Sequence, residues 1–338
     1  MMDTATYINE IRNQLFSMEP GNVETLALQV FRFQYEHNLL YRQYCEAIKT
    51  DIKKINNIEA IPFLPIRFFK SKQVTTTSFE PELVFESSGT TGSVNSKHFV
   101  KEKALYAESF LTAFELFYGK SSGCILGLLP TYLERQHSSL VYMVNELIKQ
   151  SKHPESGFYL YDTEKLYNTL RKNEEEQQPT ILIGVTYALL DFAEKYQMKL
   201  TSTVIMETGG MKGRREELTR KEVHRQLKER LGLNEIHSEY GMTELLSQAY
   251  SKGNGIFKCP PWMKVLLRSE DDPFYVLSST SIPGNFATGA VNIIDLANLY
   301  SCAFIATDDM GKLYPDESFE IHGRLVDSDV RGCGLMIV

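Results

Sequence analysis

The chain has 338 residues, of which 43% are hydrophobic and 23% charged, as is ordinary for a folded globular protein. This length exceeds the size at which one hydrophobic core usually stops growing, so we expect one large domain with an appendage, or two lobes. Lysine and arginine number 36 against 43 aspartates and glutamates, and the net charge of −7 argues against a nucleic-acid partner.

The first 60 residues are predicted to form a helical N-terminal extension (1–60) packed on the core. Apolar residues recur there at helical spacing, for example at Leu26, Val30 and Phe33. The start of the chain lacks the apolar segment of a secretion signal, and the longest apolar run, ILIGVTYALLDF, is shorter than the roughly 20 residues that span a membrane. We therefore expect a cytoplasmic protein with no membrane span.

An α/β core is predicted over residues 61–255, after the proline-containing run IPFLPIRFFK. From residue 83 onward, strand-like apolar runs alternate with segments of helical spacing. The predicted strands are LVFES, CILGLLP, GFYLY, TILIGV, TVIMET and EIHSEY, with helices near 101–117 and over 136–150, 162–173, 186–196 and 215–231. Strands separated by helices indicate βαβ units and an α/β fold, with a mostly parallel sheet flanked by helices.

A smaller antiparallel β region is predicted over residues 256–338, packed on the main sheet and ending in a short mobile tail. Here short strand-like runs follow one another without helices and are separated by proline and glycine. These runs are KVLLRS, FYVLSS, GAVNIIDL and CAFIATDD.

The segment ESSGTTGSVNSKH at 86–98 is a candidate phosphate-binding loop. It follows the predicted strand LVFES, and its glycines and small side chains let backbone N–H groups turn inward around an anion. Neither GxxxxGK[ST] nor GxGxxG is present. Taken alone, such a loop is either a simple turn or a phosphate site, to which Lys97 could add a point charge.

Four further segments follow the loop in order, and together the five resemble the adenylate-forming (AMP-binding) superfamily of acyl- and aryl-CoA ligases, luciferases and peptide-synthetase adenylation domains. They are ETGGMKG at 207–213, SEYGMTE at 238–244, ATDDMG at 306–311 and HGRLVDSDVRG at 322–332. Within that superfamily, PTYLERQHSSLVYMV, TGGMKGR and the ending DVRGCGLMIV are most similar to LuxE-type acyl-protein synthetases. The resemblance runs from about residue 80 to the end and implies the fold of the superfamily's large N-terminal domain.

The resemblance implies ATP and Mg²⁺ as cofactors, and it assigns roles to the first of these segments. The loop would hold the leaving β- and γ-phosphates through Ser87, Ser88, Gly89, Thr90, Thr91 and Gly92. In YGMTE, Tyr240 would stack on adenine, Gly241 would lie beside the nucleotide, and Thr243 would touch the α-phosphate. Glu244 would bind the metal, as a carboxylate bridging Mg²⁺ to phosphate suits a hard cation. An isolated YGMTE could equally be a strand end with a glycine turn and a threonine N-cap.

The resemblance also implies the residues that hold the sugar and the base. Asp309 would accept both ribose hydroxyls, since a carboxylate has two acceptor oxygens. Asp308 stands where the family often has glycine, so the sequence leaves open which acid binds the sugar. Arg324 would contact the ribose or phosphate. Gly209 and Gly210 would let the backbone approach the base.

Other candidate residues are expected to lie near the substrate carboxylate and the phosphates. His137 and Arg135 lie in the segment where the superfamily places groups that face the substrate carboxylate, although a polar helix start explains them as well. Members of the superfamily continue beyond HGRLVD into a small domain with a catalytic lysine, whereas this sequence ends at Val338. We expect that domain to be lacking. The positive charge of its lysine would then be supplied by Lys97, Lys212 or Arg331, unless adenylation is slow or assisted by a partner.

Cys333 is the candidate acyl acceptor. In LuxE-type proteins a cysteine near the C-terminus takes the acyl group from the adenylate, and Cys333 occupies that position. A thiolate is a natural acceptor from a mixed anhydride, and Arg331 would favour the thiolate form. An incidental terminal thiol is the simpler alternative.

The sequence therefore predicts an ATP-dependent ligase that converts a fatty acid or other carboxylic acid to acyl-AMP. The acyl group would pass to Cys333 and then to a protein partner, a reductase or a carrier. One alternative is transfer to coenzyme A or a carrier protein with Cys333 idle. Another is a nucleotide-binding module without catalysis.

Overall fold

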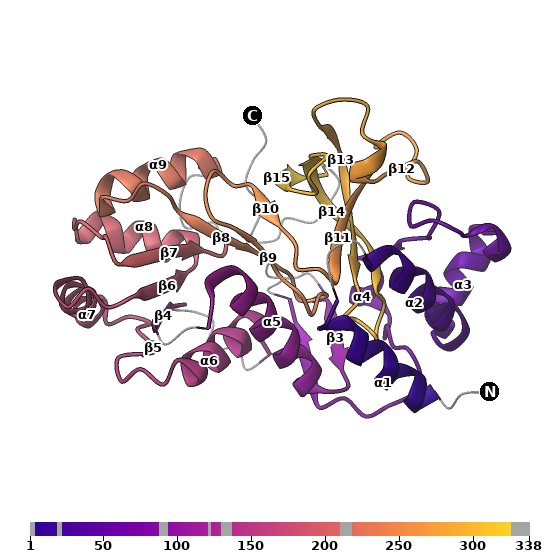
Figure 1. Ribbon diagram of the computed structural model, residues 1–338, viewed down its shortest axis with the longest axis horizontal. Helices are drawn as coiled ribbons and strands as arrows, with labels where there is room; N and C mark the ends of the chain where they lie inside the picture. Colours follow the sequence, from indigo (N-terminus) through magenta and orange to yellow (C-terminus); the bar gives the residue numbers. More distant parts are fainter. Residues whose placement is uncertain are drawn as a thin grey trace.

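The computed structural model describes residues 4–18, 22–87, 94–120, 123–129, 137–209 and 218–325. Within these residues, 13 strands form one large sheet and two more form a separate hairpin. Figure 1 shows two parts joined through the sheet, with the parallel strands at the left and the antiparallel strands at the right.

One end of the large sheet consists of parallel strands in the order β5-β4-β6-β7-β8. Every residue of β4, CILGL, is buried, as are most residues of β6 and β7. Parallel strands covered on both faces read as continuous apolar runs, which is how the sequence pattern identified them. Their bounds are Cys124–Leu128 (β4), Gly157–Phe158 (β5), Thr180–Gly184 (β6), Thr203–Glu207 (β7) and His237–Tyr240 (β8).

Helices flank these strands, so the predicted α/β class is confirmed. Helices α5 and α6 pack on each other, as do α8 and α9 (Figure 1). Side-chain caps begin three of the helices: Ser138 on α6, Asp162 on α7, and Thr219 on α9, where Glu222 completes a capping box. The helices are α5 (Lys103–Tyr118), α6 (Ser139–Ser151), α7 (Thr163–Glu175), α8 (Thr186–Lys195) and α9 (Arg220–Leu231).

The antiparallel region continues the same sheet through the antiparallel pair β8–β9, in the order β9-β10-β15-β14-β13-β11-β12. It is more extensive than the sequence pattern suggested, because the short strands β9, β10 and β15 link it edge to edge with the parallel strands. Its strands are β9 (Ala249–Ser251), β10 (Phe257–Lys258), β11 (Met263–Arg268), β12 (Val276–Leu277), β13 (Ala287–Asp295), β14 (Phe304–Leu313) and β15 (Phe319–Arg324), with the 3-10 helix η2 (Ser279–Ser281) between β12 and β13.

The predicted strand at 83–87 does not join the parallel sheet. Instead β2 (Leu83–Glu86) pairs antiparallel with β3 (Lys97–Val100) in the separate hairpin. The sequence expectation that this strand opens the series of βαβ units was wrong, because its neighbour is the strand that follows the loop. The hairpin therefore presents the Ser/Thr/Gly segment as the connection between two strands.

The N-terminal helices lie against the antiparallel region (Figure 1). Gln34 donates from Nε2 to the carbonyl of Asn298 (2.8 Å), and Asn38 donates from Nδ2 to the carbonyl of Ser301 (2.9 Å). Both side chains are buried, so these bonds fix the helices on the 298–303 loop. The elements are α1 (Thr4–Leu15), α2 (Val23–His37), α3 (Leu39–Ala47), η1 (Ile52–Lys54), β1 (Leu64–Pro65), which pairs with β14, and α4 (Phe68–Ser71).

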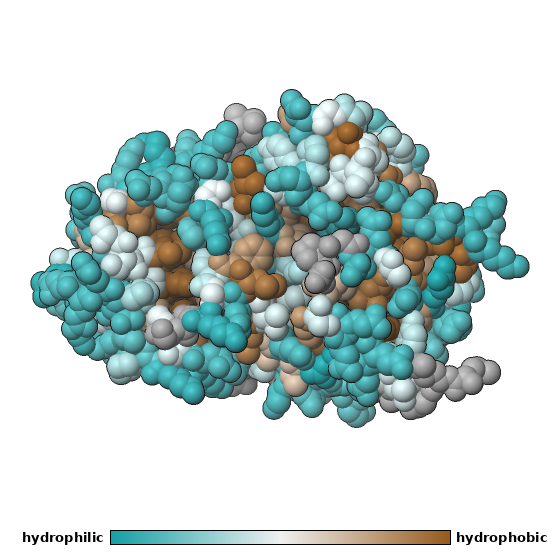
Figure 2. Space-filling model, in the orientation of Figure 1, coloured by the Kyte–Doolittle hydropathy of each residue, from teal (hydrophilic) through white to brown (hydrophobic). Residues whose placement is uncertain are grey.

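The face of the molecule in Figure 2 is mainly hydrophilic, and apolar residues show through in smaller patches. In the part of the chain that the structure describes, no helix is both long and apolar enough to cross a membrane.

Candidate nucleotide site

The neck of the candidate phosphate loop is fixed by the hairpin. Ser96 donates from its backbone N–H to Oγ of Ser87 (2.9 Å), and Ser87 donates from its own N–H to the carbonyl of Ser96 (3.0 Å). On the next rung, the ammonium of Lys97 lies 3.3 Å from Glu86. Ser87 and Lys97 thus stand on either side of the point where the loop begins and ends, with Lys97 neutralised by the facing carboxylate.

A buried histidine holds this hairpin to the YGMTE segment. His98 lies 2.9 Å through Nδ1 from the carbonyl of Thr243 and 3.0 Å through Nε2 from Oγ of Ser301. Burial lowers the pKa of His98 to about 4, although the bond to Thr243 and the charge of Glu244 oppose this shift. The neutral ring must donate from Nδ1, because a carbonyl only accepts, and it accepts the hydroxyl proton of Ser301 at Nε2.

The carboxylate of Asp309 is the meeting point of three distant segments. Tyr240, at the end of β8, donates its hydroxyl to Oδ2 (2.8 Å), and Arg324, at the end of β15, donates from Nε to Oδ1 (3.2 Å). Asp309 is 8% exposed. Three of the residues predicted from the sequence therefore lie in one cluster.

Asp308 points to the other face of β14, because successive side chains of a strand alternate. Its carboxylate lies 3.8 Å from Nε of Arg67. Of the two acids, Asp309 and not Asp308 contacts Tyr240 and Arg324, and which acid binds the sugar stays a prediction.

The ring of Tyr240 is largely buried. Phe257 of β10 and Phe319 of β15 pack against it, with ring centroids 5.9 and 5.7 Å away, and the residue is 8% exposed. A base that stacks on Tyr240 would therefore meet only the small part of the ring that these neighbours leave open. Burial and the adjoining Asp309 carboxylate raise the pKa of Tyr240, so its hydroxyl stays a donor.

Glu207 shapes the turn after β7, a role that sequence reasoning missed. Gly209 has φ of +77°, which favours glycine, and its N–H donates to Oε1 of Glu207 (2.8 Å). Burial alone would raise the pKa of Glu207, but the neighbouring His224, Arg220 and Thr186 outweigh it and hold the pKa at about 2. The charged carboxylate of Glu207 therefore orients the backbone N–H of Gly209, just after the end of β7.

Glu239 is a second carboxyl that the sequence did not single out. Burial, followed by the charge of Glu207, raises the pKa of Glu239 to about 8. Its Oε1 would clash with a Cβ added at Gly241, so the glycine of YGMTE makes room for this side chain. The signal in the sequence was the acid placed two residues before that glycine.

Replacing Glu239 with glutamine is expected to stabilise the protein at pH 8. Between its ordinary pKa of 4.5 and the folded value of about 8, Glu239 keeps its proton in the folded chain and loses it in the unfolded chain. Stability therefore falls as pH rises through this window, by on the order of 3 kcal/mol after allowance for partial exposure. Urea unfolding at pH 5 and pH 8 should show a flatter decline in Glu239→Gln than in wild type.

The exposed Glu175, on α7, provides the control for this experiment. Glu175→Gln should leave the pH dependence as in wild type. An equally steep decline in Glu239→Gln and in the wild-type protein would contradict the shifted pKa.

Glu244 is fully buried, and the surrounding chain fixes its backbone. Asn298 donates from Nδ2 to the Glu244 carbonyl (2.9 Å), and buried Asp295 accepts from the N–H groups of Leu246 (2.8 Å) and Ser247 (2.9 Å). Because Gln34 also binds Asn298, the N-terminal helices contribute to the support of this segment.

His137 is exposed and lies beside the hairpin. Its Nδ1 is 3.1 Å from the carbonyl of Val84, and its own carbonyl accepts from the N–H of Glu86 (2.9 Å). His137 is thus brought to the strand that leads into the loop. The other predicted residues lie outside the described residues: Ser88, Gly89, Thr90, Thr91, Gly92, Arg135, Gly210, Lys212, Arg331 and Cys333.

Two described carboxylates, Asp309 and Glu244, have the oxygen atoms that ribose hydroxyls and Mg²⁺ need. The two oxygens of Asp309 accept from Tyr240 and Arg324, and each keeps a second lone pair for one hydroxyl of a vicinal diol. The described residues include no group of three or more histidine, cysteine or acidic side chains arranged as metal ligands. Glu244, the carboxylate predicted to hold Mg²⁺, is fully buried in this structure, so that role stays a prediction.

Comparison with known proteins identifies similar chains. A family model described as acyl-protein synthetase, LuxE, matches residues 19–338. The long-chain-fatty-acid–luciferin-component ligase of Aliivibrio fischeri is 23% identical, over 99% of this chain and 92% of that protein. The ligase of the same name from Photorhabdus luminescens is 43% identical over 97 residues, which are 26% of this chain and 83% of that protein.

Among solved structures, O-succinylbenzoate coenzyme A synthetase from Bacillus subtilis, in complex with ATP and magnesium ion, is similar with a TM-score of 0.50. The match has 14% identity and covers 73% of this chain and 52% of that one, so this chain spans about half the length of that structure. At this identity the likeness concerns the fold.

Proposed function

This chain belongs to the LuxE family of acyl-protein synthetases, and from that premise we propose that it activates a fatty acid, or another carboxylic acid, with ATP. The substrate carboxylate attacks the α-phosphorus, the bond to the bridging oxygen breaks, and pyrophosphate leaves with the electron pair. The products are acyl-AMP and pyrophosphate. The observation that carries this proposal is the convergence of Tyr240 and Arg324 on Asp309.

The nucleoside end is held at that cluster. Asp309 accepts the two ribose hydroxyls, and Arg324, already bonded to Asp309, contacts the ribose or the α-phosphate. Tyr240 contacts adenine with its open ring edge, and the glycine turn at Gly209 and Gly210 lets the backbone approach the base. The left-handed φ of Gly209 supports this role.

The phosphates are held between the hairpin and the YGMTE segment. The loop from Ser87 to Gly92 binds the leaving β- and γ-phosphates, with Gly241 and Thr243 on the opposite side near the α-phosphate. Glu244 would hold Mg²⁺, which would supply neutralisation of phosphate charge. The bond between His98 and Thr243 supports this arrangement, because it ties the two segments to each other.

Positive charge near the reacting groups comes from Lys212 or Arg331, or from Lys97 once it leaves its ion pair with Glu86. His137, together with Arg135, is proposed to face the substrate carboxylate, since two anions must meet during attack. The position of His137 beside the strand that enters the loop is consistent with this role.

The acyl group is then transferred to Cys333. Its thiolate attacks the acyl carbonyl, the carbon–sulfur bond forms, and AMP leaves with the electrons of the broken carbon–oxygen bond. The described cysteines are poorer candidates, because burial raises the pKa of each: Cys45, to about 12, and Cys124, Cys259 and Cys302. A protein partner, a reductase or a carrier, takes the acyl group from Cys333.

We propose that three parts of the chain have different roles. Residues 61–255 form the nucleotide-binding core, and residues 256–338 form a β-rich subdomain that supplies the ribose-binding acid. Residues 1–60 form a helical extension that braces the site, as the bonds of Gln34 and Asn38 to the 298–303 loop suggest.

Acid-dependent exchange of labelled pyrophosphate into ATP tests the proposal. A panel of fatty acids of different chain length is incubated with protein, ATP and Mg²⁺. Exchange on the order of tenfold or more above the rate without acid is expected for at least one acid. Exchange that no acid stimulates, in a protein that still binds ATP, would leave only a nucleotide-binding module.

A further inference from the structure

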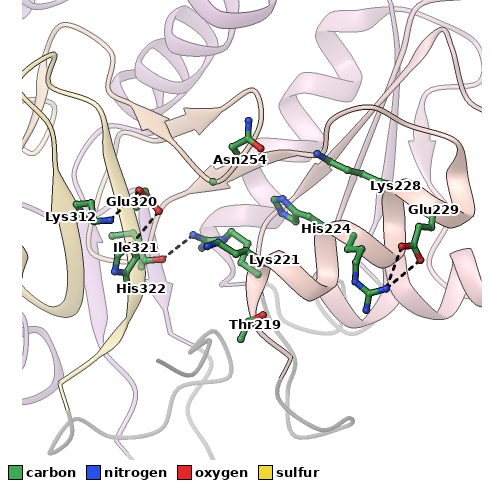
Figure 3. Close-up of a pocket in the computed structure, with 13 residues that line it drawn as sticks. Thr219, Lys221, His224, Lys228, Glu229, Asn254, Lys312, Glu320, Ile321 and His322 are labelled. Carbon is green, nitrogen blue, oxygen red and sulfur yellow. Dashed lines mark hydrogen bonds and ion pairs between the residues drawn. The ribbon is translucent and has the colours of Figure 1, made fainter. Parts of the chain in front are cut away.

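A basic cleft lies between α9 and the strands β14 and β15. It has a volume of about 860 Å³, and the turn at Asn254 and Gly255, between β9 and β10, also lines it. In Figure 3, Lys221, His224 and Lys228 of α9 lie on one side, and Lys312, Glu320 and His322 lie on the other. Arg324 and Asp309 are absent from its lining residues, but His224 in its floor lies 3.8 Å from Glu207, so the cleft adjoins the candidate nucleotide site without including those two residues.

The cleft is positive in a chain that is negative overall. Five basic side chains and two carboxylates line it, and a third carboxylate, Glu235, pairs with Lys228 (2.9 Å), which leaves an excess of two positive side-chain charges in a chain that carries −7 overall. The charged residues are Arg220, Lys221, Arg225, Lys228, Lys312, Glu229 and Glu320. Such a local excess inside a concave surface attracts anions.

Several of these charges are available to a ligand. Lys221 is exposed and, among the residues that the structure describes, makes no ion pair. Arg225 pairs with Glu229 of the same helix (3.3 Å), with both side chains more than 60% exposed. An exposed pair of this kind contributes little stability and is readily exchanged for a stronger anion.

The floor of the cleft holds polar groups that are buried. His224 is 6% exposed, and its Nε2 lies 3.4 Å from Oγ of Ser238 and 3.8 Å from the carboxylate of Glu207. Arg220 is fixed by a bond from Nη1 to the carbonyl of Ile321 (3.0 Å) and by the ring of Phe257 (5.2 Å), and its buried Nε has no partner. An unused buried donor, Nε of Arg220, at the base of a basic cleft points to a ligand that accepts hydrogen bonds.

The size of the cleft favours a small molecule over a protein segment. Small-molecule pockets commonly measure about 300–1,000 Å³, and this one falls in the upper part of that range. Arginine forks together with lysines are the groups that recognise phosphate. We propose that the cleft binds a phosphate-bearing small molecule of nucleotide size, at a site distinct from the one where ATP is bound.

The test is isothermal titration calorimetry on the full chain, with coenzyme A, adenosine 3′,5′-bisphosphate and inorganic pyrophosphate as probes. An acyl-sulfamoyl adenosine occupies the candidate nucleotide site throughout. The variant carries Lys221→Gln and Arg225→Gln. Loss of two charge-assisted contacts is expected to raise the Kd of the tightest probe about tenfold or more, and affinity should fall with added salt.

A matched control carries Lys165→Gln and Arg171→Gln on α7, where Arg171 pairs with Glu175 (3.6 Å) much as Arg225 pairs with Glu229. This control should bind the probes as wild type does, and both double variants should retain wild-type pyrophosphate exchange. Because the readout is a difference in binding, it stands even if the chain does not adenylate an acid.

The probes also separate two sources of phosphate. Equal affinity for pyrophosphate and the larger probes supports an inorganic polyphosphate, whereas tighter binding of the larger probes supports a phosphorylated nucleotide-type ligand. The proposal is overturned if no probe binds at millimolar concentration in 0.1 M salt, or if the Lys221→Gln, Arg225→Gln variant binds as wild type. Tighter binding of hexaglutamate than of every phosphate probe also overturns it, in favour of an acidic protein segment.

Discussion

Replacing Asp309 with asparagine is expected to lower kcat/KM for ATP in pyrophosphate exchange about 100-fold, because two hydrogen bonds to a charged acceptor weaken at once. The asparagine keeps the shape of the side chain but removes the charge that Arg324 and the ribose share. Exchange kinetics over a range of ATP concentrations measure the effect, and most of it should fall on KM for ATP.

The neighbouring Asp308 is a matched control, since it is adjacent in sequence and faces Arg67 on the other side of β14. Asp308→Asn should change kcat/KM for ATP by no more than about twofold, as expected of a pair outside the site. Tyr240→Phe removes only the hydroxyl bond to Asp309 and should have an intermediate effect. Equal losses in the Asp308 and Asp309 variants would contradict the assignment of the ribose site.

Replacing Cys333 with serine is expected to abolish covalent acylation of the protein while pyrophosphate exchange continues. A serine hydroxyl is a far weaker nucleophile than a thiolate near neutral pH, whereas formation of acyl-AMP does not involve this residue. Incubation with ATP and a labelled fatty acid, followed by denaturing electrophoresis, measures the acyl-protein. Wild-type label should be released by hydroxylamine, as a thioester is.

Cys259→Ser is the matched control for Cys333, because Cys259 is the one described cysteine that is not fully buried. It should keep both the label and the exchange. Label retained on Cys333→Ser would show that Cys333 is idle and would favour direct transfer to coenzyme A or to a carrier protein.

The alternation of helices and parallel strands could be predicted because apolar runs and helical spacing are strong local signals. The strands with which short extended runs pair could not be predicted from the sequence. The run LVFES has the composition of a buried strand, yet it pairs with the strand after its own loop. The strands β9 and β10 are too short for a periodic pattern, so the link between the two parts of the sheet was missed.

Candidate site residues that lie in motifs could be predicted from the sequence. Residues that reach the candidate site only through long-range contacts could not. Tyr240, Asp309 and Arg324 each lie in a motif, but the choice between Asp308 and Asp309 depends on the face of β14. His98 was missed, because its partners Thr243 and Ser301 lie 145 and 203 residues away.

A crystal structure of the protein with a bound acyl-sulfamoyl adenosine tests most directly whether these segments form one nucleotide pocket. We expect both ribose hydroxyls within hydrogen-bond distance of Asp309, with Arg324 beside them and the sulfamoyl group near Thr243. An analogue bound away from Tyr240, Asp309 and Arg324 would contradict the account.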